Sequence, residues 1–193
     1  MRIVGGALGG RRFAGPRGGR IRPTSEKVRE ALASVLESRD AIADSTVLDL
    51  FAGTGALSFE LLSRGASRSL LVDRDRHALD AIRKSAAALG IGDRVSTLAL
   101  DLFGSPPSVT ARIGAALEGA VALVVADPPW DEAQGAVPLL AALAQSGLTS
   151  PECLFVFEHA TRAVPALPAG LATVARYRYG DTSVILASIG AAP

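Results

Sequence analysis

The segment at residues 127–130, Asp-Pro-Pro-Trp, has side chains suited to holding a planar amine. An ionised aspartate accepts hydrogen bonds without donating any, and two prolines stiffen the backbone and remove two of its donors. Asp127 and the Pro128 carbonyl therefore predict a rigid pair of acceptors for an NH₂ group, beside an indole on which a nucleobase can stack. A proline turn followed by a core tryptophan is the alternative. The candidate catalytic residues are Asp127, Pro128, Pro129 and Trp130.

The glycine turn at residues 49–55, Asp-Leu-Phe-Ala-Gly-Thr-Gly, is a second candidate site. Glycine allows a sharp turn and a close approach of the backbone to a ligand, and free amides at a helix start suit a polar group. A dinucleotide fingerprint would have a third glycine where this chain has Ser58. The turn alone is therefore compatible with several ligands, or with a purely structural role.

Acidic residues after further strand-like runs favour a nucleoside ligand. Asp73 lies 20 positions after Gly53, where a carboxylate can accept both ribose hydroxyls, and Asp101 is placed to reach an adenine amino group. A pyrophosphate fits poorly among these carboxylates, so we expect cationic S-adenosylmethionine rather than a nicotinamide dinucleotide. The predicted cofactor-binding residues are Asp49, Phe51, Ala52, Gly53, Thr54, Gly55, Asp73, Arg74, Asp101 and Leu102.

The elements that must position these residues follow from the spacing of apolar side chains. Short apolar runs, β-branched or aromatic, predict buried strands at 46–51, 69–73, 95–100, 120–126 and 153–157. Apolar positions three and four apart predict helices at 56–63, 74–89 and 133–145, a capping sequence predicts one at 24–36, and 105–117 is ambiguous because two prolines open it. Residues 171–179 and 182–188 predict an antiparallel hairpin. Together these elements predict a doubly wound, mostly parallel α/β sheet with a C-terminal antiparallel hairpin and a short N-terminal β-hairpin arm.

Length and composition indicate a single domain that carries a short arm. Of the 193 residues 49% are hydrophobic and 20% charged, enough for a substantial core. We predict a Gly/Arg-rich arm at 1–23 and a catalytic domain at 24–193. No run approaches the roughly 20 apolar residues of a membrane span, and none suits a signal peptide. Cys153 alone forms neither an internal disulfide nor a cysteine metal cluster. We expect a soluble, cytoplasmic monomer without a metal.

Charge is divided unevenly along the chain. Residues 1–29 carry eight basic side chains and one acidic, a net charge of +7, whereas the rest carries 12 basic and 18 acidic, a net charge of −6. A basic arm on an acidic body indicates either a polyanionic partner or a solvated tail. The candidate RNA contacts are Arg11, Arg12, Arg17, Arg20, Arg22 and Arg29.

Together these motifs resemble a known family. The glycine turn resembles the S-adenosylmethionine motif of class I methyltransferases, and residues 127–130 are similar to the (Asp/Asn)-Pro-Pro-aromatic motif of those that methylate base or glutamine amines. Further similar segments lie at 1–6, 10–12, 22–25, 29–32, 57–66 and 179–182. From residue 1 to about 188, the chain resembles the bacterial small-subunit rRNA guanine-N2 methyltransferases of the RsmD type. Ala33-Ser34 replaces the frequent Phe-Asn, and Trp130 replaces the commoner Tyr or Phe.

The resemblance implies transfer of a methyl group from S-adenosylmethionine to the exocyclic N2 amine of a guanine in 16S rRNA, within an assembling or assembled 30S subunit. Three alternatives stay open. The chain could methylate another amine, in DNA adenine or protein glutamine. It could be a dinucleotide-dependent oxidoreductase, although the third glycine is missing, or a non-catalytic rRNA-binding assembly factor.

Overall fold

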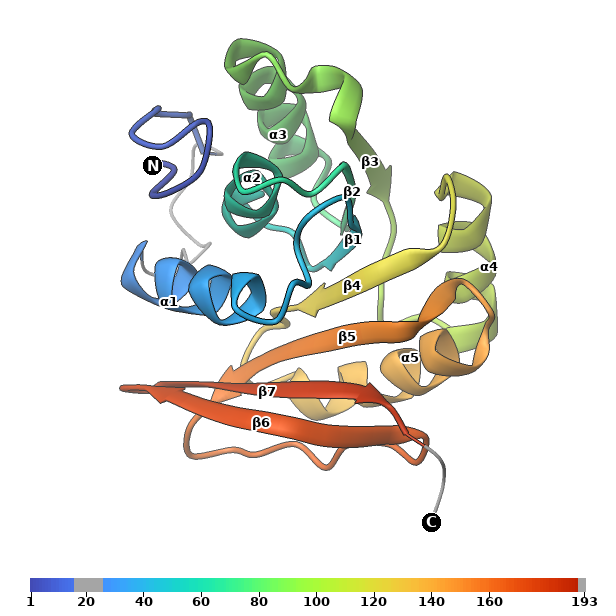
Figure 1. The fold of residues 1–193 in the computed structure, drawn as a ribbon. Helices are drawn as coiled ribbons and strands as arrows, with labels where there is room; N and C mark the ends of the chain where they lie inside the picture. Colours follow the sequence, from blue (N-terminus) through green and yellow to red (C-terminus); the bar gives the residue numbers. More distant parts are fainter. Residues whose placement is uncertain (16–25, 191–193) are drawn as a thin grey trace.

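The computed structural model describes residues 1–15 and 26–190, and these form a twisted sheet flanked by helices (Figure 1). The strands of the described residues are β1 (Thr46–Leu50), β2 (Arg68–Asp73), β3 (Val95–Ala99), β4 (Val121–Ala126), β5 (Thr149–Ala160), β6 (Leu171–Tyr179) and β7 (Thr182–Ile189). The helices in this part of the chain are α1 (Glu26–Glu37), α2 (Ala56–Ser63), α3 (Arg76–Leu89), α4 (Pro106–Ala116) and α5 (Ala133–Gln145), with one 3-10 turn, η1 (Gly92–Arg94).

The strand order is β3-β2-β1-β4-β5-β7-β6, which confirms the predicted doubly wound sheet. Strands β1 to β5 pair in parallel, whereas β7 runs antiparallel to both β5 and β6, as the predicted hairpin requires. The ambiguous segment contains α4, whose opening prolines occupy the first turn, where a helix needs no backbone donors. Strand β5 extends beyond the predicted bounds at both ends, because Thr149 pairs with Val121 of β4 and residues 158–160 pair with β7. The expected capping residues before α1 lie outside the described residues.

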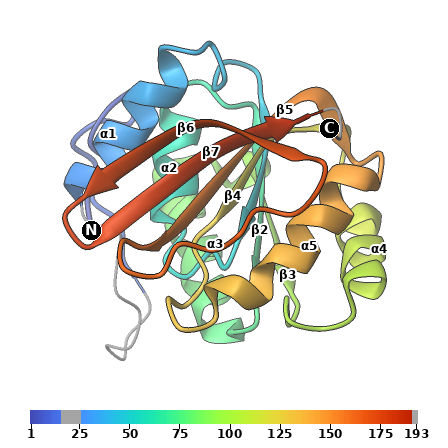
Figure 2. The ribbon, with the colours of Figure 1, turned by 90° about the horizontal axis from the view of Figure 1, so that it is seen from below.

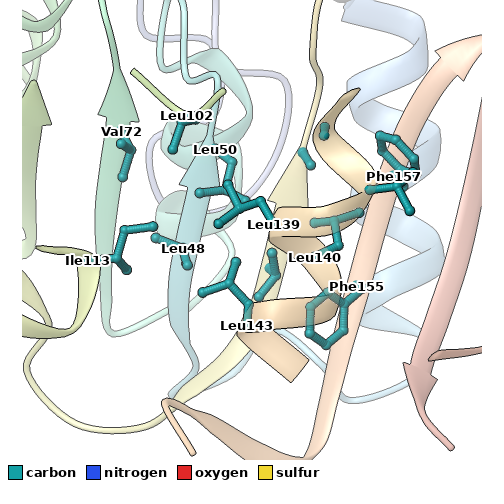
Figure 3. Packing of buried hydrophobic residues seen from close by; sticks show 14 of the residues in the cluster. Leu48, Leu50, Val72, Leu102, Ile113, Leu139, Leu140, Leu143, Phe155 and Phe157 are labelled. Atoms are coloured by element: carbon teal, nitrogen blue, oxygen red, sulfur yellow. The ribbon is translucent and has the colours of Figure 1, made fainter. Parts of the chain in front are cut away.

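Helices cover both faces of the sheet, with α1, α2 and α3 on one side and α4 and α5 on the other (Figure 2). The α4–α5 cluster includes Leu48, Leu50, Val72, Leu102, Ile113, Leu139, Leu140, Leu143, Phe155 and Phe157 (Figure 3). The α1–α3 cluster includes Ile3, Phe13, Leu32, Val47, Phe59, Leu71, Ile82, Val125, Val156 and Val184. Successive strand residues thus enter opposite clusters, which is why the strands read as unbroken apolar runs.

The first residues of the chain form a small hairpin that packs on α2. The Ile3 amide donates to the Arg11 carbonyl at 3.0 Å, and the Phe13 amide donates to the Met1 carbonyl at 3.1 Å. Both Ile3 and Phe13 are buried, and the Phe13 ring meets Phe59 of α2 edge-on at 5.0 Å. This part of the predicted arm is therefore built into the body of the protein, while its predicted end at residue 23 lies outside the described residues.

A buried carboxylate on α2 holds this hairpin in place. Glu60 is fully buried, and it accepts the Val4 and Gly5 amides, each at 2.8 Å. The Arg64 Nε donates to the same carboxylate at 3.0 Å, and a second Arg64 nitrogen reaches Glu37 at 2.8 Å. Three donors thus compensate for the loss of water around the Glu60 carboxylate.

Replacing Glu60 with glutamine should lower the free energy of unfolding by about 2–3 kcal/mol, because the amide nitrogen would face a backbone donor. Glu37→Gln removes the exposed partner of the same arginine and should cost less than about 0.5 kcal/mol. Urea denaturation measures both variants. Equal losses would show that the Glu60 carboxylate does not anchor the hairpin.

In the described ranges, no helix combines the length and the apolar character needed to cross a membrane.

Candidate active site

A cavity of about 580 Å³ opens at the carboxyl ends of the parallel strands. Loops that follow β1, β2, β3 and β4 form its wall, around the point where the strand order reverses between β1 and β4. Open α/β sheets bind ligands at such a switch point, and the volume is typical of small-molecule sites.

Most residues predicted from the sequence meet in this cavity. From the two predicted sites, its wall contains Asp49, Phe51, Ala52, Gly53, Thr54, Asp73, Arg74, Asp101, Leu102, Asp127, Pro128, Pro129 and Trp130. Gly55 is absent from the wall and precedes α2 with a φ of 71°. A Cβ there would come within 3.0 Å of Ile82 and 3.1 Å of Leu71, so glycine is needed for helix packing and backbone conformation.

The tip of β1 has an unusual backbone. Phe51 has a φ of 62°, in the left-handed region that costs a non-glycine residue on the order of 1 kcal/mol or more. Its ring packs against Phe103 with ring centres 5.3 Å apart, and the following Ala52 amide donates to the Val72 carbonyl at 3.0 Å. These contacts hold the turn so that Gly53 lies in the cavity wall.

Asp73 joins the two loops that form the cofactor side of the cavity. Its Oδ2 accepts the Gly53 amide and its Oδ1 accepts the Asp75 amide, both at 2.8 Å. Asp75 in turn caps α3 by accepting the His77 amide. A carboxylate oxygen can accept two hydrogen bonds, so both Asp73 oxygens retain capacity for a pair of ligand hydroxyls.

Asp49 is a buried acid below the turn. The Ser58 hydroxyl donates to its Oδ2 at 2.6 Å and lies 2.9 Å from the Ser69 hydroxyl. Burial raises the pKa of Asp49 to about 7, opposed by the Ser58 hydrogen bond and assisted by the negative charges of Asp127 and Asp73. Ser58, at the position of the missing third glycine, thus has a structural role in holding this acid. The surroundings favour a positively charged ligand.

Stability should decrease as the pH rises from about 4 to about 7. In this range the unfolded state ionises Asp49 near its ordinary pKa of 3.8, while the folded state keeps the proton until about 7. Titration of Asp49 should lower the free energy of unfolding by up to about 4 kcal/mol across this range. Urea denaturation across the range measures it, with Asp49→Asn as the control. Parallel curves for the two proteins would show that Asp49 titrates normally.

The 127–130 segment follows β4 directly and enters the same cavity as the glycine turn. The Asp127 amide lies 3.5 Å from the Leu50 carbonyl, which ties the segment to β1. Pro128 is buried, Asp127 and Trp130 are partly buried, and Pro129 is exposed. A ligand in this cavity can therefore contact both predicted sites at once.

The predicted RNA-contact arginines have different surroundings. Arg29 on α1 is only 1% exposed, donates to the Arg2 carbonyl at 3.0 Å and lines the cavity. Burial lowers its pKa, opposed by Glu60 and Glu26. Arg11 donates to the Leu89 and Ala88 carbonyls at the end of α3, at 2.7 and 2.9 Å. Arg12 is exposed on the hairpin. Arg17, Arg20 and Arg22 lie outside the described residues.

The cavity also contains residues to which the sequence analysis gave no role. They are Val28, Ala56, Leu57, Asp75, Leu100, Phe103, Val125, Glu158, Tyr179, Asp181 and Thr182. Glu158 directly follows the predicted strand at 153–157, so the strand-end reasoning that found Asp73 could also have found it. The residues from the turn between β6 and β7 become neighbours of the site only through antiparallel pairing.

The strand order and the glycine turn at its switch point define the class I methyltransferase fold. The chain belongs to the family described as "Conserved hypothetical protein 95", whose model matches residues 1–188. A solved structure described as "Putative methyltransferase yhhF from Escherichia coli" is 29% identical, with a TM-score of 0.78, and the match covers 98% of this chain and 97% of that one.

Two curated relatives confirm the resemblance to the RsmD type. "Ribosomal RNA small subunit methyltransferase D" of Escherichia coli (strain K12) is 40% identical over 93 residues, 48% of this chain and 46% of the relative, so the match spans about half of that protein. "Putative rRNA methyltransferase YlbH" of Bacillus subtilis (strain 168) is 27% identical over 187 residues, which cover 96% of this chain and 97% of the relative.

Proposed function

We propose that this protein transfers a methyl group from S-adenosylmethionine to the exocyclic N2 amine of a guanine in small-subunit rRNA. The main support is the shared cavity, where the amine-holding segment 127–130 faces the same space as the glycine turn and Asp73. The similarity to the Escherichia coli protein named as a ribosomal RNA small subunit methyltransferase supports ribosomal RNA as the substrate.

The residues of the cavity fit this cofactor. Each Asp73 oxygen already accepts one backbone amide, which orients the carboxylate toward a ribose diol. Negative charge from Asp73 and Asp127 favours a sulfonium and an ammonium group over a pyrophosphate. S-adenosylmethionine, when bound, supplies an electrophilic methyl group on a cationic sulfur.

Asp127 and the Pro128 carbonyl would accept the two N2 hydrogens of the guanine. The lone pair of this nitrogen is delocalised into the ring, so holding both hydrogens directs the developing lone pair at the methyl carbon. A nitrogen–carbon bond would form as the carbon–sulfur bond of the bound donor breaks, leaving neutral S-adenosylhomocysteine, and the nitrogen would then release one proton to water. The Asp127 carboxylate stabilises the positive charge that arises on nitrogen meanwhile. Trp130 would stack on the guanine after it leaves its own stack.

Methyl transfer from tritiated S-adenosylmethionine to small subunits of a strain that lacks this protein tests the proposal. The label should enter 16S rRNA, and mass spectrometry should identify N2-methylguanosine. DNA and a glutamine-containing peptide serve as parallel substrates for the closest alternatives. Label in another product, or binding of a nicotinamide dinucleotide in place of S-adenosylmethionine, would contradict the proposed function.

We propose that Arg12, which is exposed, and the neighbouring Arg17, Arg20 and Arg22 of the sequence position the rRNA by contacting its phosphates. Deleting residues 1–20 would also remove buried Ile3 and Phe13, so substitution is the cleaner test. The combined variant with Arg12, Arg17, Arg20 and Arg22 changed to glutamine should raise the KM for subunits about 10- to 100-fold and weaken its salt dependence.

Arg112→Gln, on α4 at the other face of the sheet, is the control for the arm variant and should change neither quantity. Cofactor affinity, measured by calorimetry, should stay the same in both proteins. An unchanged KM in the combined variant would remove the arm from RNA binding.

A further inference from the structure

The amine-holding segment cannot by itself select guanine. Adenine, cytosine and a glutamine amide all present an NH₂ group whose two hydrogens would satisfy Asp127 and the Pro128 carbonyl equally well. These substrates differ in the group beside the amine. A residue that selects guanine must therefore lie next to Asp127 in the same cavity.

Glu158 of β5 occupies this position. Ala126, the last residue of β4, pairs with Phe157 of the parallel strand β5, so Asp127 leaves the end of β4 next to Glu158, the following residue of β5. Such strands lie about 4.8 Å apart. Both residues line the cavity, and Glu158 is only 5% exposed.

The two carboxylates also belong to the same face of the sheet. Val125 and Val156 pack in the α1–α3 cluster, and side chains alternate along a strand, so the residues two positions further face that side again. Glu158 also pairs with Val184 of β7, another member of this cluster. Tyr179 and Thr182 also line the cavity.

We propose that Glu158 accepts the N1–H of the target guanine and so determines base specificity; this inference rests on the proposed function. An ionised carboxylate only accepts, so the group that faces it must be a donor. In guanine the atom beside the 2-amino group carries a hydrogen. The corresponding ring nitrogen of adenine or cytosine is an acceptor, and beside a glutamine NH₂ stands a carbonyl oxygen. Each of these acceptor atoms would face the Glu158 carboxylate with a lone pair instead of a hydrogen, and the repulsion between the lone pairs would disfavour binding.

A base that keeps the reacting amine and lacks N1–H tests this assignment. 2-Aminopurine is suitable, and it can be placed at the methylated position of a 16S rRNA that is then reconstituted into subunits. The wild-type protein should methylate it at least about 100-fold less efficiently, in kcat/KM, than guanine. Glu158→Gln should methylate guanine about 10- to 100-fold more slowly than the wild-type protein does. Its ratio of kcat/KM for guanine to kcat/KM for 2-aminopurine should be at least tenfold smaller than the wild-type ratio. The glutamine NH₂ can donate to the N1 acceptor of 2-aminopurine, and any effect of its missing O6 is the same for the wild-type protein and the variant.

Glu152→Gln, which changes an exposed carboxylate of the same strand, is the matched control and should keep the wild-type preference. Cofactor affinity measured by calorimetry should be unchanged in both variants. Equal methylation of guanine and 2-aminopurine by the wild-type protein would overturn the role of Glu158, even if the variant does not fold. An unchanged preference in a folded Glu158→Gln protein would do the same. If the wild-type protein methylates neither base, the proposed function fails instead.

Discussion

Asp127→Ala should lower the rate of methyl transfer about 10³-fold while the dissociation constant of S-adenosylmethionine changes less than about threefold. The variant loses one of the two acceptors that orient the amine, together with the charge that stabilises the developing cation. The cofactor side of the cavity, centred on Asp73 and Gly53, has its own hydrogen bonds and should keep its geometry. The small change in affinity reflects the loss of one negative charge near Asp49.

Single-turnover kinetics with small subunits measures the rate, and calorimetry measures the affinity. Asp127→Asn is the matched control, because its amide oxygen still accepts one hydrogen bond, and it should lose only about 10- to 100-fold. A rate for Asp127→Ala within a factor of ten of wild type would remove Asp127 from the catalytic role.

Asp73→Ala should weaken S-adenosylmethionine binding about 10²- to 10³-fold. Asp73 has two functions in the structure: it offers acceptors to a ribose diol, and it holds the amides of Gly53 and Asp75 at 2.8 Å. The alanine variant loses both, so the two loops of the cofactor side lose their common anchor. Turnover at saturating cofactor should fall far less than affinity, because Asp73 has no role in orienting the amine.

The measurement is calorimetry with S-adenosylhomocysteine, supplemented by KM and kcat for the methyl donor. Asp101→Ala is the comparison: this exposed carboxylate accepts only the Phe103 amide among the described contacts, at 3.1 Å, and its loss should cost about tenfold. If Asp73→Ala and Asp101→Ala bound S-adenosylhomocysteine with equal affinity, Asp73 would not be the main anchor of the cofactor side.

Much of the fold follows from local patterns. The observed α2, α5 and β6 have the predicted bounds, because short runs of apolar residues and the glycines and prolines between them act over a few positions. The glycine turn and the 127–130 segment could be found for the same reason, since each is a continuous stretch whose chemistry depends on adjacent residues.

The sequence by itself therefore determined most of the strands and helices and the two short motifs, whose interactions lie within a few residues. Only the tertiary structure placed Glu158 beside Asp127, and Glu60 beneath a hairpin more than fifty residues earlier in the chain. The tertiary structure also showed that Arg11 donates to the Leu89 carbonyl at the end of α3, 78 positions later in the chain. The charge of Arg11 alone had indicated an RNA contact. Spacing along a chain does not reveal which distant side chains meet, because strand order and helix packing bring them together only once the whole sheet has formed.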